Sequence, residues 1–137
     1  MNRSFQKNNL FNLSSIRNPE GTYEIIGYNQ DKEQSGYTGY LKLIATSKNR
    51  VNAIWTISGI QTQTGKGFFK EDILVINFAY LGELRNRPKT FKGVVVYKLI
   101  NENILDGFWS EKYGDDNYLG FEEGRRMTNP AIDGNKL

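Results

Sequence analysis

Apolar and polar residues alternate along most of the chain between residues 21 and 127. In segment 51–57, for example, Val51, Ala53 and Trp55 would lie on one face of an extended strand, opposite Asn52 and Thr56. A period of two is typical of a β-strand with one buried face. The pattern recurs between short runs of turn residues and predicts strands at 22–28, 37–45, 51–57, 60–69, 73–80, 91–100, 105–111 and 119–127.

The connections between these segments are short, and none carries a helical pattern long enough for a parallel crossover. Consecutive strands are therefore expected to be antiparallel. A meander of eight strands has two exposed edges, and closure into a barrel removes them. A sandwich would need longer connections. The pattern predicts an all-β fold, an eight-stranded antiparallel up-and-down β-barrel.

The two ends of the chain differ from this pattern. Residues 1–20 are rich in Asn and Ser, and the spacing of Leu10, Leu13 and Ile16 is compatible with a short N-terminal helix or with a frayed tail. Residues 128–137 contain Asn-Pro and Asp-Gly pairs, which are typical of loops. We expect an N-terminal extension at 1–20, one barrel domain at 21–127 and a flexible C-terminal tail at 128–137.

The alternation also indicates which side chains point into the barrel. If the aromatic and glycine positions form the inner face, its aromatic and polar members are candidate ligand-binding residues: Tyr23, Tyr37, Trp55, Gln61, Gln63, Tyr97, Trp109 and Glu122. The inward glycines would bend the strands or leave room for bulky neighbours.

Two interpretations of this inner face are open. The aromatic side chains could fill the core, or they could line a cavity, because an eight-stranded barrel is just wide enough for either. Burying Gln61, Gln63 and Glu122 without partners would cost a few kcal/mol each, so these side chains favour a cavity with a polar ligand, water or a hydrogen-bond network.

The chain of 137 residues contains neither Cys nor His. This excludes disulfides, zinc-finger sites, Cys nucleophiles and Ser-His-Asp triads. Adjacent Glu122 and Glu123 would point to opposite faces of a strand, while Asp115 and Asp116 lie in a predicted turn beside Gly114. We expect a non-enzymatic protein with no cofactor and no metal.

The net charge of +3 is concentrated at the ends of the chain, and the barrel region has nearly equal numbers of basic and acidic side chains. A nucleic-acid partner is therefore not expected. One local exception surrounds Pro88 and could be a solvated loop or an anion contact: Arg85, Arg87, Lys89 and Lys92.

No apolar run is long enough for a membrane helix, and residues 1–19 lack the apolar region of a secretory signal. We expect a cytoplasmic protein if Met1 is the native start, and a secreted or periplasmic one if a signal was removed.

The order of glycine and aromatic residues resembles small bacterial β-barrels of avidin- or lipocalin-like shape, some of them labelled fibronectin-binding. The resemblance covers about residues 21–124 and rests on Gly21-x-Tyr23-x-x-x-Gly27, Tyr37-x-Gly39-x-Leu41, Trp55, Gly65-x-Gly67, Gly93-Val94-Val95-Val96-Tyr97, Leu105-x-Gly107-x-Trp109 and Gly120-x-Glu122. It implies a barrel. It implies no biotin site, because the biotin-binding residues of avidin do not map onto this chain.

Three functions follow from these features. The first is binding of an unidentified small molecule in the lumen. The second is a protein-interaction or adhesion module, or a homo-oligomer, because several apolar side chains would point outward: Tyr28, Tyr40, Phe68, Val94, Val96, Ile100, Phe108 and Phe121. The third is a nucleotide-sensing barrel, in which aromatic side chains stack bases and the basic cluster meets phosphates.

Overall fold

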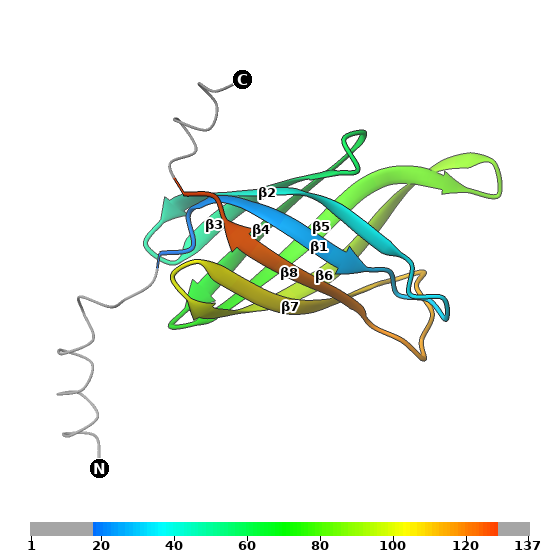
Figure 1. Ribbon diagram of the computed structural model, residues 1–137. Coiled ribbons are helices and arrows are strands. Elements are labelled where there is room, and N and C mark those ends of the chain that lie inside the picture. The colour runs from blue at the N-terminus through cyan, green and yellow to red at the C-terminus, as the bar shows by residue number, and fades with distance from the viewer. Residues whose placement is uncertain (1–17, 129–137) are drawn as a thin grey trace, which may run out of the picture.

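The computed structural model describes residues 18–128, which form a closed barrel of eight antiparallel strands (Figure 1). The strands are β1 (Gly21–Tyr28), β2 (Gly36–Ser47), β3 (Arg50–Ile57), β4 (Gln61–Lys70), β5 (Ile73–Leu84), β6 (Arg87–Asn101), β7 (Ile104–Glu111) and β8 (Gly120–Arg126). Each strand pairs with the next, and β8 pairs with β1. The predicted up-and-down barrel is confirmed. The candidate N-terminal helix and residues 129–137 lie outside the described residues.

The β5–β6 hairpin is longer than the sequence pattern predicts. The expected loop at 81–90 is wrong: the strands stay paired as far as Leu84 and Arg87 and turn through Arg85 and Asn86, whose φ angles are 54° and 64°. Since β6 pairs with β7 only from Gly93 onward, the outer part of the hairpin projects from the barrel as a two-stranded ribbon (Figure 1). Pro88 is tolerated because its strand has a neighbour on one side only there.

One end of the barrel is sealed, and both described chain ends lie there (Figure 1). The Arg126 guanidinium donates hydrogen bonds to the carbonyl oxygens of Asn18 (2.8 Å), Glu102 (2.8 Å) and Glu20, and lies 5.0 Å from the Tyr23 ring centroid. Buried side chains fill this end of the lumen: Tyr23, Leu43, Val51, Leu74, Leu99 and Leu105.

The loops at the opposite end are joined by the buried side chain of Gln30. Its Nε2 donates to Ser110 Oγ and the Tyr118 carbonyl, both at 2.9 Å, and its Oε1 accepts from the Glu111 amide at 2.9 Å. Gln30 therefore ties the β1–β2 loop to the end of β7 and the loop that follows it.

The inner face follows the predicted alternation. Four of its large aromatic side chains lie opposite glycines of a neighbouring strand, in the pairs Tyr37–Gly27, Phe78–Gly93, Tyr97–Gly107 and Trp109–Gly120. A Cβ atom at any of these glycines would lie 2.0–2.6 Å from the paired ring. The glycines thus leave the space that the rings occupy. Room for bulky neighbours was one of the two roles that the sequence predicted for them. Residues 18–128 contain no helix that could cross a membrane.

Candidate functional site

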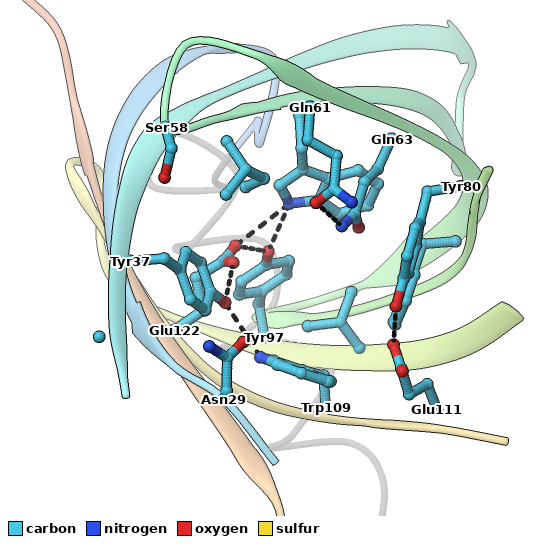
Figure 2. A pocket seen from close by; sticks show the side chains of 15 residues that line it. Asn29, Tyr37, Ser58, Gln61, Gln63, Tyr80, Tyr97, Trp109, Glu111 and Glu122 are labelled. Atoms are coloured by element: carbon cyan, nitrogen blue, oxygen red, sulfur yellow. Dashed lines mark hydrogen bonds between the residues drawn. The ribbon is translucent and has the colours of Figure 1, made fainter. Parts of the chain in front are cut away.

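The open end of the lumen contains a cavity of about 300 Å³. Its lining combines aromatic, amide and carboxyl side chains from all around the barrel: Asn29, Gly36, Tyr37, Trp55, Ile57, Ser58, Gln61, Gln63, Phe78, Tyr80, Val95, Tyr97, Trp109, Glu111 and Glu122. Seven of the eight predicted lumen residues are among them. Figure 2 shows Tyr37 and Glu122 on one side of the cavity, with Tyr80 and Glu111 on another.

Glu122 is the centre of the polar network, although only 5% of its surface is exposed. Its Oε1 accepts a hydrogen bond from the Tyr37 hydroxyl at 2.7 Å, and its Oε2 accepts from Trp55 Nε1 at 3.1 Å and from the Tyr97 hydroxyl (Figure 2). The three donors come from β2, β3 and β6, and the carboxyl from β8. Closure of the barrel is therefore what assembles the network.

The direction of these hydrogen bonds follows from the chemistry of tryptophan, which only donates. Trp109 Nε1 donates to the Tyr37 hydroxyl oxygen at 3.0 Å, which leaves the Tyr37 proton for Glu122. Trp55 Nε1 lies within reach of both Glu122 and the Tyr97 hydroxyl, 3.2 Å away. Both chains of donors end on the carboxyl group as acceptor.

Burial sets the protonation behaviour of this network. Loss of solvent raises the pKa of Glu122, and the hydrogen bonds from Tyr97, Tyr37 and Trp55 oppose that rise without cancelling it. Burial also raises the pKa of Tyr37 and of Tyr97, and the nearby Glu122 acts in the same direction. Both phenols therefore keep the protons that they donate.

Apolar rings form much of the remaining wall. Phe78 makes edge-to-face contacts with Trp55 and with Trp109, with centroids 6.1 Å apart in each case. At the mouth, the Tyr80 hydroxyl donates to Glu111 Oε2 at 2.7 Å. Alternation predicts Phe78 on the inner face, but Phe78 was not expected in the site, and Tyr80 and Glu111 were missed. Continuing the period of two from Phe78 and from Trp109 would have found both.

Tyr23, the eighth predicted residue, does not line the cavity. It lies near the start of β1 at the sealed end, where its hydroxyl donates to the Pro19 carbonyl at 2.8 Å. Alternation correctly turns it inward, but it does not specify the depth at which an inward side chain lies along the lumen.

The predicted anion-contact residues also lie outside the lumen lining. Arg85 is in the ribbon turn, and Arg87, Lys89 and Lys92 are exposed on β6. Lys89 and Lys92 border a separate surface depression that includes Lys112 and Tyr113. The lysine ammonium nitrogens of Lys89 and Lys112 lie 5.6 and 5.5 Å from the Tyr113 ring centroid. Anion binding at this surface stays a prediction.

The adjacent acidic pairs behave as their positions predict. Glu123 points away from the lumen and forms an ion pair with Arg125 at 3.2 Å, while the Asp115 carboxylate accepts the Asn117 amide at 2.9 Å within a turn. Within residues 18–128, no group of acidic side chains gathers in a way that could hold a metal ion.

The fold and cavity together define a closed eight-stranded up-and-down barrel with one open, polar-lined end. Among solved structures, the chain is similar to "a redesigned beta barrel, mFAP1, bound to DFHBI" (TM-score 0.61, 17% identity, 78% of this chain and 94% of the other). It is also similar to "a redesigned beta barrel, b11L5F_LGL" (TM-score 0.61, 18% identity, 80% of this chain and 91% of the other). A third similar structure is "EF1p2_mFAP2b bound to DFHBI" (TM-score 0.57, 18% identity, 79% of this chain and 93% of the other).

These similarities show the fold. No protein-family model and no curated protein matches the chain. The barrel that the sequence resemblance implied is thus supported, whereas the avidin-like and fibronectin-binding labels have no support at the family or sequence level.

Proposed function

We propose that the protein is a non-enzymatic binding protein that holds a small molecule in the barrel lumen. The observation that carries this proposal is the cavity of about 300 Å³, open at one end and lined by aromatic rings around a few convergent polar groups. Small-molecule sites have this composition, and their volumes begin at about this size. Two of the similar solved barrels have DFHBI bound, which supports the use of such a lumen for a small ligand.

The absence of enzymatic activity is part of the proposal. The most deeply buried acid of the cavity, Glu122, is engaged by three fixed donors, and the chain has no His or Cys to pair with it. General acid–base catalysis most often uses His as the group that exchanges a proton with the substrate. The network is better suited to orienting a bound ligand.

Intrinsic fluorescence tests the proposal directly, because the chain has two tryptophans and both line the cavity. We expect members of a small-molecule library to change the emission of Trp55 and Trp109 in a saturable manner and to raise the melting temperature. Native mass spectrometry of the purified protein would reveal a ligand that co-purifies.

A pair of variants on one strand provides the control. Gln63→Phe would fill the lumen and is expected to abolish binding, whereas Thr64→Phe would place the same ring on the exposed outer face and leave binding intact. A library without any saturable binder, together with a ligand-free mass spectrum, would contradict the proposal.

A second candidate function, self-association, is favoured by the outer surface. Six apolar side chains lie in one cross-strand row on β1, β8, β7, β6, β5 and β4, and we call them the outer apolar belt: Tyr28, Phe121, Phe108, Val96, Val75 and Phe68. The four aromatic members are 45–49% exposed. A contiguous apolar patch of this kind is typical of an interaction surface.

The structure gives less support to nucleotide sensing and to matrix binding than to the two functions above. Nucleotide sensing would bring phosphates to the basic cluster and bases to the lumen aromatics, but the basic cluster does not line the lumen. It stays a prediction, as does binding to an extracellular matrix protein.

A further inference from the structure

The cavity lining is unequal in charge. Among residues 18–128, the charged side chains that line it are Glu111 and Glu122, and no Lys or Arg of this part of the chain does so. An anionic ligand would therefore face two carboxyl groups and no compensating cation, at a depth where solvent screens charge poorly.

The hydrogen bonds around Glu122 hold its carboxyl group as an acceptor. An ionised carboxylate has about four lone-pair positions. Oε2 accepts from Trp55 and Tyr97, whereas the lumen network gives Oε1 the single donor Tyr37. A ligand N–H group can therefore complete the coordination of Oε1 without displacing any of the three donors.

Burial makes a negative charge on Glu122 costly, and within residues 18–128 no basic side chain forms an ion pair with it. A cation bound against the carboxylate would offset this cost, because an ion pair replaces an isolated buried charge. The cavity wall is also rich in aromatic side chains, among them Trp55, Trp109 and Tyr80, and a cation that lies over the face of an aromatic ring is stabilised.

We infer that the lumen selects a small organic cation, an amidinium or ammonium group on an apolar or aromatic body, and that Glu122 binds its charged nitrogen. This inference rests on the proposed function and names its ligand class.

The test uses three ligands of nearly the same shape and different charge: benzamidine, benzamide and benzoate. Titration followed by the fluorescence of Trp55 and Trp109, with melting temperature as a second readout, gives their relative affinities. We expect benzamidine to bind at least about tenfold more tightly than benzamide, equivalent to ~1.4 kcal/mol, and benzoate to bind most weakly.

Two adjacent residues of β8 provide matched variants. Glu122→Gln keeps the shape of the side chain and removes its charge, so it is expected to abolish the preference for benzamidine while benzamide still binds. Glu123→Gln removes a charge from the outer face and is expected to leave all three affinities unchanged. Glu111→Gln measures the contribution of the carboxyl at the mouth. If Glu122→Gln does not fold, the comparison of the three ligands on the unmodified protein still decides the inference.

The release of a proton when the ligand binds can be measured. A Glu122 that only stabilised the fold would not release one. The titratable groups that face the cavity with Glu122 are Tyr37 on β2, Tyr80 on β5, Tyr97 on β6 and Glu111 on β7. The phenols have raised pKa values and stay protonated. At a pH below the native pKa of Glu122, benzamidine binding should draw Glu122 into its ionised form, so the calorimetric heat of binding should depend on the ionisation enthalpy of the buffer. The heat of benzamide binding should not.

The outcomes separate the inference from the proposed function. Equal affinities for the three ligands, or tighter binding of benzoate, would overturn the cation preference and leave a small-molecule site in place. If none of the three ligands binds at millimolar concentration but library ligands do, the inference fails alone. If the library also yields no binder, the proposed function fails with it.

Discussion

Glu122 has an unusual setting for a carboxylic acid, because it is surrounded by three aromatic donors and, within the described part of the chain, by no cation. Ionisation of a buried carboxyl that lacks a cationic partner is unfavourable, because the charge loses its solvation. The three donors reduce that cost, and each must lie at a definite height in the lumen to do so. Tyr37 and Tyr97 reach Glu122 because each ring lies over a glycine of the neighbouring strand, Gly27 and Gly107.

This setting predicts how stability depends on pH. The pKa of Glu122 is higher in the folded barrel than its ordinary value of 4.5. The stability that its protonated form contributes is therefore fully present below pH 4.5 and is lost as the pH rises through the native pKa. Relative to Glu122→Gln, the unmodified protein should lose melting temperature as the pH rises above about 4.5, by roughly 3–5 °C for each kcal/mol of stability lost.

The exposed neighbour is the control for this measurement. Glu123→Gln should give a melting profile parallel to that of the unmodified protein, because its carboxyl stays in solvent. Parallel profiles for Glu122→Gln as well would mean that burial does not perturb the carboxyl group.

At the scale of elements, the long β5–β6 ribbon and the loops at the mouth surround the cavity entrance. Rings continue from the lumen onto the ribbon: Phe78 stacks with Tyr80 at 6.5 Å, and Tyr80 stacks with Phe91 at 5.2 Å. On the opposite side, Gln30 holds the loop after β7 against the β1–β2 loop. The mouth is thus formed by elements that contact one another as well as the barrel.

Removing the Gln30 side chain should loosen the mouth. Gln30→Ala would leave the Glu111 amide and the Tyr118 carbonyl without their partner, at a cost of about 1–3 kcal/mol in the free energy of unfolding. Chemical denaturation measures this loss, and hydrogen exchange should show faster exchange of the Glu111 amide. Glu33→Ala, an exposed change in the same loop, should do neither. An unchanged exchange rate for Glu111 would show that Gln30 does not hold the loop.

At the scale of the whole molecule, the barrel has an inner and an outer apolar surface with different consequences. The inner surface is sealed at one end by Arg126 and Tyr23 and leaves a cavity at the other. The outer surface presents the outer apolar belt across six neighbouring strands. Closure of the sheet removes the free strand edges of the barrel and leaves unpaired edges on the outer part of the β5–β6 ribbon, so association through the belt would use side chains.

If the belt is an interface between copies, light scattering after size exclusion should give a multiple of the 15.7 kDa chain mass. Replacing both Phe108 and Phe121 with Ser should give the mass of one chain, since both side chains lie on the belt. Tyr40→Ser, which removes an equally exposed aromatic side chain outside the row, should not. A single-chain mass at all concentrations for the unmodified protein would exclude the belt as a self-association surface.

Much of the site could be predicted from the sequence because a strand has a period of two. Once the inward face was chosen correctly, Trp55, Gln63 and Glu122 followed from their positions in their strands. The error over Tyr23 has a different origin, since periodicity fixes direction and carries no information about height. The ribbon was missed because a proline among charged residues is typical of a loop. Pro88 fits a strand here only because that part of β6 has no second neighbouring strand, and the sequence does not indicate this.

Alternation and short turns, both local properties of the chain, were enough to specify eight antiparallel strands, their closure and the face that each side chain occupies. Contacts between residues far apart in the sequence were not accessible in this way. The convergence of Tyr37, Trp55 and Tyr97 on Glu122, the tie made by Gln30 and the open end of the lumen depend on register between strands. Register is an outcome of packing the whole barrel, and only the tertiary structure decided it.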